Sequence, residues 1–305
     1  MILFALLLAA AADFDGRWNL ALDGDPRGRV WWLEVRGAAT AKPEGRFVGA
    51  PGGQMDAIPS IELKGNQLHW YFERGYGPGG PQRGHYQASF ENGKLVGSLE
   101  VPGLPNVGRK FIGTRAPVIR DVDDGRWRAG APVELFNGKD TSGWECRVKG
   151  RGMDWHVEEG LLKNKKGAAD ITSTQKFWNF KLHAEFRYQQ KSNSGIGLRG
   201  RYEVQIYDDF GDAPSLHGNG ALYSRVAPRV NASRKPGEWQ TFDITLIGRQ
   251  LTVVLNGKTL MDKQVVEGFT AMATDAAEDQ AGPITLQGDH GPVEFRKITV
   301  TPLAR

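Results

Sequence analysis

The sequence is poor in cysteine, in clustered charge and in long apolar runs. Cys146 is the only cysteine among 305 residues, which excludes an intrachain disulfide and a thiolate metal cluster. The 39 Lys and Arg residues against 35 Asp and Glu leave a net charge of +4, without any block of basic residues. Because phosphate binding needs clustered cations, no nucleic-acid partner is predicted. Beyond residue 12 no apolar run is long enough to span a bilayer, so no membrane span is predicted.

Residues 1–12 form the one continuous apolar stretch, and they end in small residues before the polar Asp13-Phe14-Asp15-Gly16. As a helix this stretch would rise about 18 Å, too little for a hydrocarbon core of about 30 Å. Such a segment is typical of a secretory signal. The sequence therefore predicts a signal peptide at 1–12 and an exported protein, periplasmic or extracellular.

The apolar periodicity of an amphipathic helix is missing as well. Short segments in which apolar and polar residues alternate, as in a strand, are frequent. Period-two alternation occurs at 29–35, 60–63 and 68–72, and Asn92-Gly93 suits the positive φ angles of a hairpin turn. Residues 13–117 are predicted to form a small antiparallel β barrel or sandwich. Residues 118–131, with Pro, Gly and alternating charges, are typical of a linker. The strand density over 132–305 favours a two-sheet sandwich, so the fold class is all-β.

Six motifs of the second region occur in one order. They are LFNGKDTSGW (135–144), WHVEEGLL (155–162), NSGIGLRGRYEVQIYDD (193–209), GALYSRVAP (220–228), PGEWQTFDITLIGRQLTVVLNG (236–257) and GPITLQGDHGPVEFRKITV (282–300). Over about 131–303 the chain resembles the 3-keto-disaccharide hydrolase domain family. The resemblance implies a concanavalin A-like jelly roll with a carbohydrate cleft. It also implies action on glycosides whose sugar carries a ketone at carbon 3.

The segment 193–209 contains the first candidate site residues. Alternate side chains of a strand share a face, so Glu203 and Gln205 should point together while Val204 and Ile206 face the core. If the strand runs straight, Arg199 lies on the face of Glu203 and keeps that carboxylate ionised. Asn193 and Asp208, near the two ends of the segment, are further candidate substrate-binding residues. An exposed strand face with a surface ion pair is the alternative.

Further candidates come from two loops and a following strand. His217 lies in a Gly-rich loop after the Glu203 strand, and Tyr223 and Arg225 share a face of a predicted strand. Gln287 and His290 lie immediately before the final strand, and the resembled family carries a similar element there. A histidine is a natural proton shuttle near neutral pH. Glu203 and His290 are therefore the candidate catalytic pair, with the order of acid and base left open. The other named residues are candidates for substrate binding.

The resemblance suggests a mechanism that these residues can support. A ketone at carbon 3 acidifies the carbon 2 proton, whose removal allows β-elimination of the aglycone from carbon 1. Water addition would make the net reaction a hydrolysis. Two other functions stay open. One is a retaining β-glucanase, for which Glu203, Gln205 and Asp208 keep an E-x-D-x-x-E spacing with two changed residues. The other is a carbohydrate-binding protein without catalysis.

No cofactor is predicted. Asp208, Asp209 and Asp212 form a small acidic loop that could bind a hard cation such as calcium, although the sequence favours solvated loop carboxylates. The expected partner is an oxidised carbohydrate, and the oligomeric state is not predicted.

Overall fold

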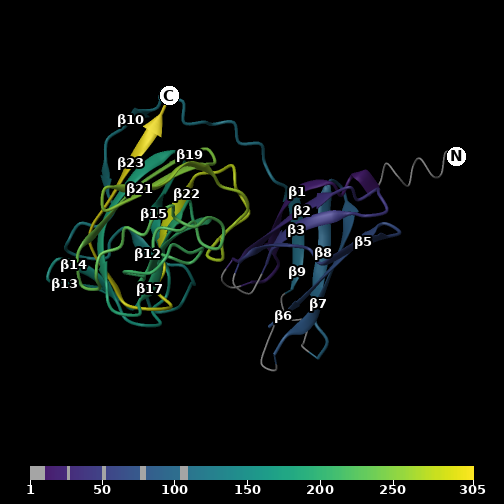
Figure 1. The fold of residues 1–305 in the computed structure, drawn as a ribbon, viewed down its shortest axis with the longest axis horizontal. Helices are drawn as coiled ribbons and strands as arrows, with labels where there is room; N and C mark the ends of the chain where they lie inside the picture. Colours follow the sequence, from purple (N-terminus) through teal and green to yellow (C-terminus); the bar gives the residue numbers. More distant parts are fainter. Residues whose placement is uncertain (1–10, 26–27, 50–52, 76–79, 104–108) are drawn as a thin grey trace. The chain divides into compact units, whose positions relative to one another are not determined.

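The computed structural model describes residues 11–25, 28–49, 53–75, 80–103 and 109–305, and it divides into two compact units. Unit 1 comprises the chain up to Pro117 together with Gly268–Glu278, and unit 2 comprises Val118–Glu267 and Asp279–Arg305. Antiparallel strands build both units, which confirms the predicted all-β fold (Figure 1). In the described ranges, no helix has the length and apolarity that crossing a membrane requires. The predicted signal segment lies almost entirely outside these ranges.

Unit 1 contains one nine-stranded sheet with the order β4-β3-β2-β1-β9-β8-β7-β6-β5. Because β1 pairs with β9, the first and last strands join the two halves, and β4 and β5 are the edges. The strands are β1 (Gly16–Leu22), β2 (Val30–Arg36), β3 (Glu44–Val48), β4 (Met55–Ala57), β5 (Ser60–Lys64), β6 (Gln67–Arg74), β7 (Gln82–Glu91), β8 (Lys94–Glu100) and β9 (Lys110–Arg115). Asn92 and Gly93, in the turn between β7 and β8, both have positive φ, as predicted.

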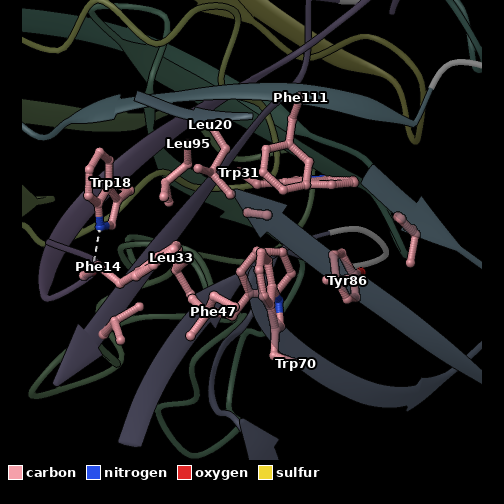
Figure 2. Close-up of a cluster of buried hydrophobic side chains, with 14 of the residues drawn as sticks. Phe14, Trp18, Leu20, Trp31, Leu33, Phe47, Trp70, Tyr86, Leu95 and Phe111 are labelled. Atoms are coloured by element: carbon pink, nitrogen blue, oxygen red, sulfur yellow. Dashed lines mark hydrogen bonds between the residues drawn. The ribbon is translucent and has the colours of Figure 1, made fainter. Parts of the chain in front are cut away.

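One face of this sheet carries an aromatic core, drawn in Figure 2. The ring centre of Tyr86 lies 5.5 Å from that of Trp31, 4.8 Å from that of Phe47 and 5.3 Å from that of Trp70. The indole N–H of Trp18 donates to Phe14 O at 2.9 Å, so its one polar atom is satisfied inside the core. Alternate residues of each strand supply these rings, as the period-two pattern indicated.

Strand β2 differs from that pattern because it is buried on both faces. The segment Gly268–Glu278, which comes from far along the chain, covers the face opposite the aromatic core. A Cβ on Gly268 would lie 3.3 Å from the Trp32 ring, and Asn19 Nδ2 donates to Glu278 Oε2 at 3.1 Å. The sequence pattern did not indicate this cover, because nothing local links 268–278 to the first sheet.

Unit 2 is a sandwich of two antiparallel sheets, as expected for a concanavalin A-like jelly roll. The larger sheet has the path β13-β14-β23-β16-β19-β20-β21, with β10 and β11 also paired to β23, and the smaller has the order β12-β15-β22-β17-β18. The strands are β10 (Arg128–Ala129), β11 (Val133–Glu134), β12 (Trp144–Cys146), β13 (Trp155–Glu158), β14 (Leu161–Asn164), β15 (Ile171–Phe177), β16 (Phe180–Tyr188), β17 (Asn193–Leu198), β18 (Tyr202–Tyr207), β19 (Gln240–Ile247), β20 (Gln250–Leu255), β21 (Lys258–Val265), β22 (Gly282–Leu286) and β23 (Val293–Ala304).

Alternation along the smaller sheet separates the core of unit 2 from a polar face. Ile196, Val204, Ile284 and Leu286 are fully buried aliphatic side chains of this sheet. Their neighbours in sequence, which point to the opposite face, include the candidate site residues Glu203, Gln205 and Gln287. The stretch 118–131, predicted as a linker, is part of unit 2. Asp121 Oδ2 accepts hydrogen bonds there from Trp178 and Asn179 at 2.8 and 2.7 Å.

Candidate active site

Glu203 and Gln205 lie side by side on the polar face of β18, as the alternation predicted. Both side chains are nevertheless buried, with residue exposures of 2% and 1%. Residues 220–223 run along the free edge of β18, where Gly220 N donates to Gln205 O at 2.8 Å and Tyr223 N donates to Glu203 O at 3.0 Å. This loop therefore covers the strand edge beside the carboxyl group.

Two glycines of the neighbouring strand make room for the Glu203 side chain. Gly195 pairs with Gln205, and Gly197 pairs with Glu203. A Cβ built on Gly195 would lie 2.5 Å from Glu203 Oε1 and 2.9 Å from its Cγ. The carboxyl group therefore extends over bare backbone of β17, in the direction of β22. The Gly-x-Gly pattern at 195–197 was a signal of this arrangement that the sequence analysis did not use.

Burial keeps the Glu203 carboxyl group protonated near neutral pH. Removal from water, together with the negative charges of Asp170 and Asp289, raises the pKa of Glu203 to about 8, against the opposing effects of His290 and Arg147. A carboxylic acid with such a pKa can give or take a proton at neutral pH. The charges of Asp170, Asp289, His290 and Arg147 thus all act on Glu203.

His290 reaches this group from the loop between β22 and β23. Asp289 accepts a hydrogen bond from His290 Nδ1, and this bond is the main reason that the pKa of His290 is raised above its ordinary value. The carboxylate fixes the proton on Nδ1, which leaves the lone pair on Nε2. The His290 side chain is half exposed, with 50% of its surface accessible. The charges of His290 and Glu203 act on each other, so a solvent-accessible imidazole lies within electrostatic range of a buried carboxyl group.

Asp170 and Arg147 complete the charged environment, and the sequence analysis missed both. Arg147 Nη1 lies 3.2 Å from Asp170 Oδ2, and Asp170 Oδ1 accepts a hydrogen bond from Gly288 N at 3.0 Å. Asp170 thereby anchors the loop that carries His290. Arg147 directly follows β12, and Asp170 directly precedes β15. The pairing of these two strands brings the residues together, so no local motif could indicate them.

The family model of the 3-keto-alpha-glucoside-1,2-lyase-like domain matches residues 131–301. The chain belongs to this family. Two candidate glycosyl hydrolases of known structure from Parabacteroides distasonis are similar to it. One is 32% identical over 61% of this chain and 91% of its own, with a TM-score of 0.48. The other is 21% identical over 57% and 94%, with a TM-score of 0.49. No curated protein sequence gave a significant match.

Several residues predicted to bind substrate lie on the same polar face of the lyase-like domain. The Gln205 amide lies 3.1 Å from Asn193 Oδ1, and in the reversed amide orientation it donates to Glu203 Oε1 at 3.1 Å. Gln287 N donates to Gly195 O at 3.0 Å, and Thr285 pairs with Gly197. Thr285 Oγ1 and Gln287 Oε1 are buried without a hydrogen-bond partner. Buried polar atoms of this kind can bind sugar hydroxyls.

Tyr223 lies at the end of the covering loop and His217 lies three residues before its start, and their ring centres are 5.0 Å apart. Tyr223 lies opposite Glu203, next to the bridge between Val204 and Leu222, and its N–H donates to Glu203 O. Burial and the charge of Glu203 raise the pKa of Tyr223. The Arg225 side chain donates to Ser224 O at 3.1 Å. Asp208 Oδ2 accepts a hydrogen bond from Lys191 N at 2.7 Å, so this carboxylate is engaged by the turn before β17.

The predicted position of Arg199 is wrong, because the strand does not run straight through it. The chain turns between β17 and β18, and Arg199 itself has a φ of 52°. The guanidinium is fully buried and donates to Gly248 O at 2.8 Å and to Asn179 Oδ1 at 3.1 Å, above the Trp178 ring. Arg199 therefore fixes this hairpin turn. The expectation that an arginine keeps Glu203 ionised is wrong for the same reason.

The acidic loop is used for hydrogen bonding within the protein. Asp209 is buried, and its carboxylate accepts from Asn219 N at 2.8 Å and from Ser233 Oγ at 2.6 Å. In the part of the chain that the structure describes, no three His, Cys, Asp or Glu side chains are grouped to hold a metal ion. The carboxylates of 208–212 are thus not gathered as a calcium site.

Proposed function

We propose that this domain cleaves 3-keto-glucosides by elimination, with His290 as the base and Glu203 as the acid. The observation that carries the proposal is the Glu203 side chain, which is buried over the bare backbone of Gly195 and has a pKa of about 8. The charge of His290, which Asp289 orients, acts on this carboxyl group. The reaction needs one group that accepts a proton and one group that donates a proton. Family membership supplies the substrate class.

The reaction has two proton transfers. Nε2 of neutral His290 takes the carbon 2 proton of the substrate, and the C–H electrons form an enediolate with the carbon 3 ketone. The enediolate then expels the aglycone oxygen from carbon 1, and this oxygen takes the proton of Glu203. The sugar leaves with a carbon 1–carbon 2 double bond, and addition of water to this bond makes the net reaction a hydrolysis. Thr285, Gln287 and Gln205 are available as donors to the ketone and hydroxyl oxygens.

We also propose that the enzyme acts outside the cytoplasm, as the apolar segment 1–12 suggests.

The test uses a 3-keto-glucoside in deuterium oxide, followed by mass spectrometry and by release of the aglycone. We expect deuterium at carbon 2 of the sugar product and slower release from substrate that is already deuterated there. The matching unoxidised glucoside should stay intact, because its carbon 2 proton is not acidic. Equal cleavage of both glycosides, or release without any isotope effect or exchange at carbon 2, would contradict the elimination.

A single methyl group at residue 195 should disable the site. In a Gly195→Ala variant the new Cβ occupies space within 2.5 Å of Glu203 Oε1, so the carboxyl group must move. A displacement of about 1 Å can cost about 10²-fold in rate, which is the loss expected in kcat. Gly152→Ala is the control, because a Cβ there meets no atom within 4 Å. Wild-type activity in both variants would show that the position of the carboxyl group is unimportant.

A further inference from the structure

The proposed reaction leaves Glu203 without its proton in a place that water does not reach freely. Glu203 is 2% exposed and is covered by residues 220–223. His290, being half exposed, can release its proton directly to solvent. If the unsaturated sugar leaves before water adds, Glu203 must regain a proton before the next turnover. A path that does not pass through the substrate site would return this proton even while a sugar still occupies the site.

The covering loop and the residues on either side of it carry side chains that can pass protons, and these side chains lie in a row that ends opposite Glu203. His217 Nε2 and Ser224 Oγ are 2.8 Å apart, and Ser224 also hydrogen-bonds to the Tyr223 side chain. The Tyr223 backbone N–H donates to Glu203 O, and its side chain lies close enough to respond to the charge of Glu203. His217 is exposed at the surface, Tyr223 is half-buried, and Ser224 and Glu203 are buried. These side chains thus lead from solvent to the buried acid.

The backbone at Ser224 supports a specific use of this residue. Ser224 has a φ of 55°, in the left-handed region that a residue other than glycine enters at an energetic cost. Its amide donates to Leu216 O at 2.9 Å, which holds it against the residue that precedes His217. The strained conformation places the hydroxyl, which is 7% exposed, next to the imidazole.

We propose that Tyr223, Ser224 and His217 form a relay that returns a proton from solvent to Glu203 after each elimination. Protonated His217 gives a proton to Ser224 Oγ, Ser224 gives its own to the Tyr223 oxygen, and Tyr223 gives its own to the Glu203 carboxylate. Each hydroxyl ends as it began, His217 becomes neutral, and water protonates it again. The relay rests on the proposed elimination but makes a separate claim about how the enzyme is reset.

Rapid-mixing kinetics with a 3-keto-glucoside carrying a chromogenic aglycone test the relay. The variants are Tyr223→Phe, His217→Gln and Ser224→Gly, the last because glycine keeps the left-handed backbone without the hydroxyl. Each should release one aglycone per enzyme at the wild-type rate and then turn over about ten-fold or more slowly, as a burst. The Ser224→Gly/His217→Gln double variant should be no slower than either single variant, because the two groups act in series. Imidazole in the buffer should restore steady turnover to a His217→Ala variant.

The outcomes separate the relay from the elimination. His156→Gln, a change at an exposed histidine of β13, is the control and should show no burst. Wild-type steady turnover in the three variants overturns the relay while leaving the elimination intact. A slower burst phase also overturns it, because the residues would then act before proton return. Absence of any cleavage by the wild-type protein refutes the proposed function itself.

Discussion

Replacing Glu203 with glutamine should lower kcat on a 3-keto-glucoside by about 10²–10⁴-fold, the usual contribution of a general acid. Glutamine has nearly the same shape and can occupy the space above Gly195, but it has no proton to give to the leaving oxygen. The measurement is release of aglycone at saturating substrate. A substrate whose aglycone is a good leaving group needs less proton donation and should lose less activity. Full activity with a poor leaving group would remove Glu203 from the mechanism.

The same variant should be more stable than the wild type at neutral pH. A pKa of about 8 in the folded protein, against 4.5 for an unperturbed glutamic acid, means that the unfolded chain ionises first as pH rises. The wild type therefore loses stability between about pH 4.5 and about pH 8, whereas Glu203→Gln does not. At pH 7 the difference in the free energy of unfolding should be about 3 kcal/mol.

Thermal melting of both proteins from pH 4 to pH 9 measures this difference. Glu145→Gln, a change at an exposed glutamate of β12, serves as the control and should melt as the wild type does. The melting temperatures of wild type and Glu203→Gln should converge at pH 4. A constant difference across the range, or a less stable variant at pH 7, would contradict the buried protonated acid.

Replacing His290 with glutamine should also lower kcat by about 10²–10⁴-fold, because an amide cannot accept the carbon 2 proton. Exchange of the carbon 2 proton with deuterium oxide should fall by the same factor, since it depends on the base alone. In Glu203→Gln, exchange should instead persist while release of the aglycone stops. This contrast assigns base and acid. The reverse pattern, with exchange lost in Glu203→Gln and retained in His290→Gln, would exchange the two roles.

Asp289→Asn changes the residue next to His290. It is a milder change, and we expect it to shift the pH dependence of kcat/KM. Loss of the carboxylate lowers the pKa of His290 toward its ordinary value, so the acid limb of kcat/KM should move to lower pH. Asp289 also raises the pKa of Glu203, so the basic limb should move to lower pH as well. A shift of either limb to higher pH would contradict the assignment.

The sequence predicts a feature of the fold or the site well when the residues that determine it are close together in the chain. Strand alternation was enough to place Glu203 and Gln205 on one face, because the period of two is local. The sequence put Arg199 in the wrong place because a three-residue turn at 199–201, within the same motif, reverses the chain. Asp170 and Arg147 could not be found, since only the pairing of β12, β15 and β22 brings them toward Glu203. The raised pKa of Glu203 was missed for a related reason, because burial by the loop at 220–223 is a tertiary effect.

The cover on β2 has a consequence for biosynthesis. Trp32 and Asn19 contact a segment that begins at Gly268, 151 positions after Pro117, where the first part of unit 1 ends. At about 5–20 residues per second, a ribosome needs roughly 8–30 s to make the intervening chain. Throughout that interval the nascent first sheet carries an uncovered apolar surface. The first unit therefore completes its folding only after residues 268–278 have been made, well after its own sheet has left the ribosome.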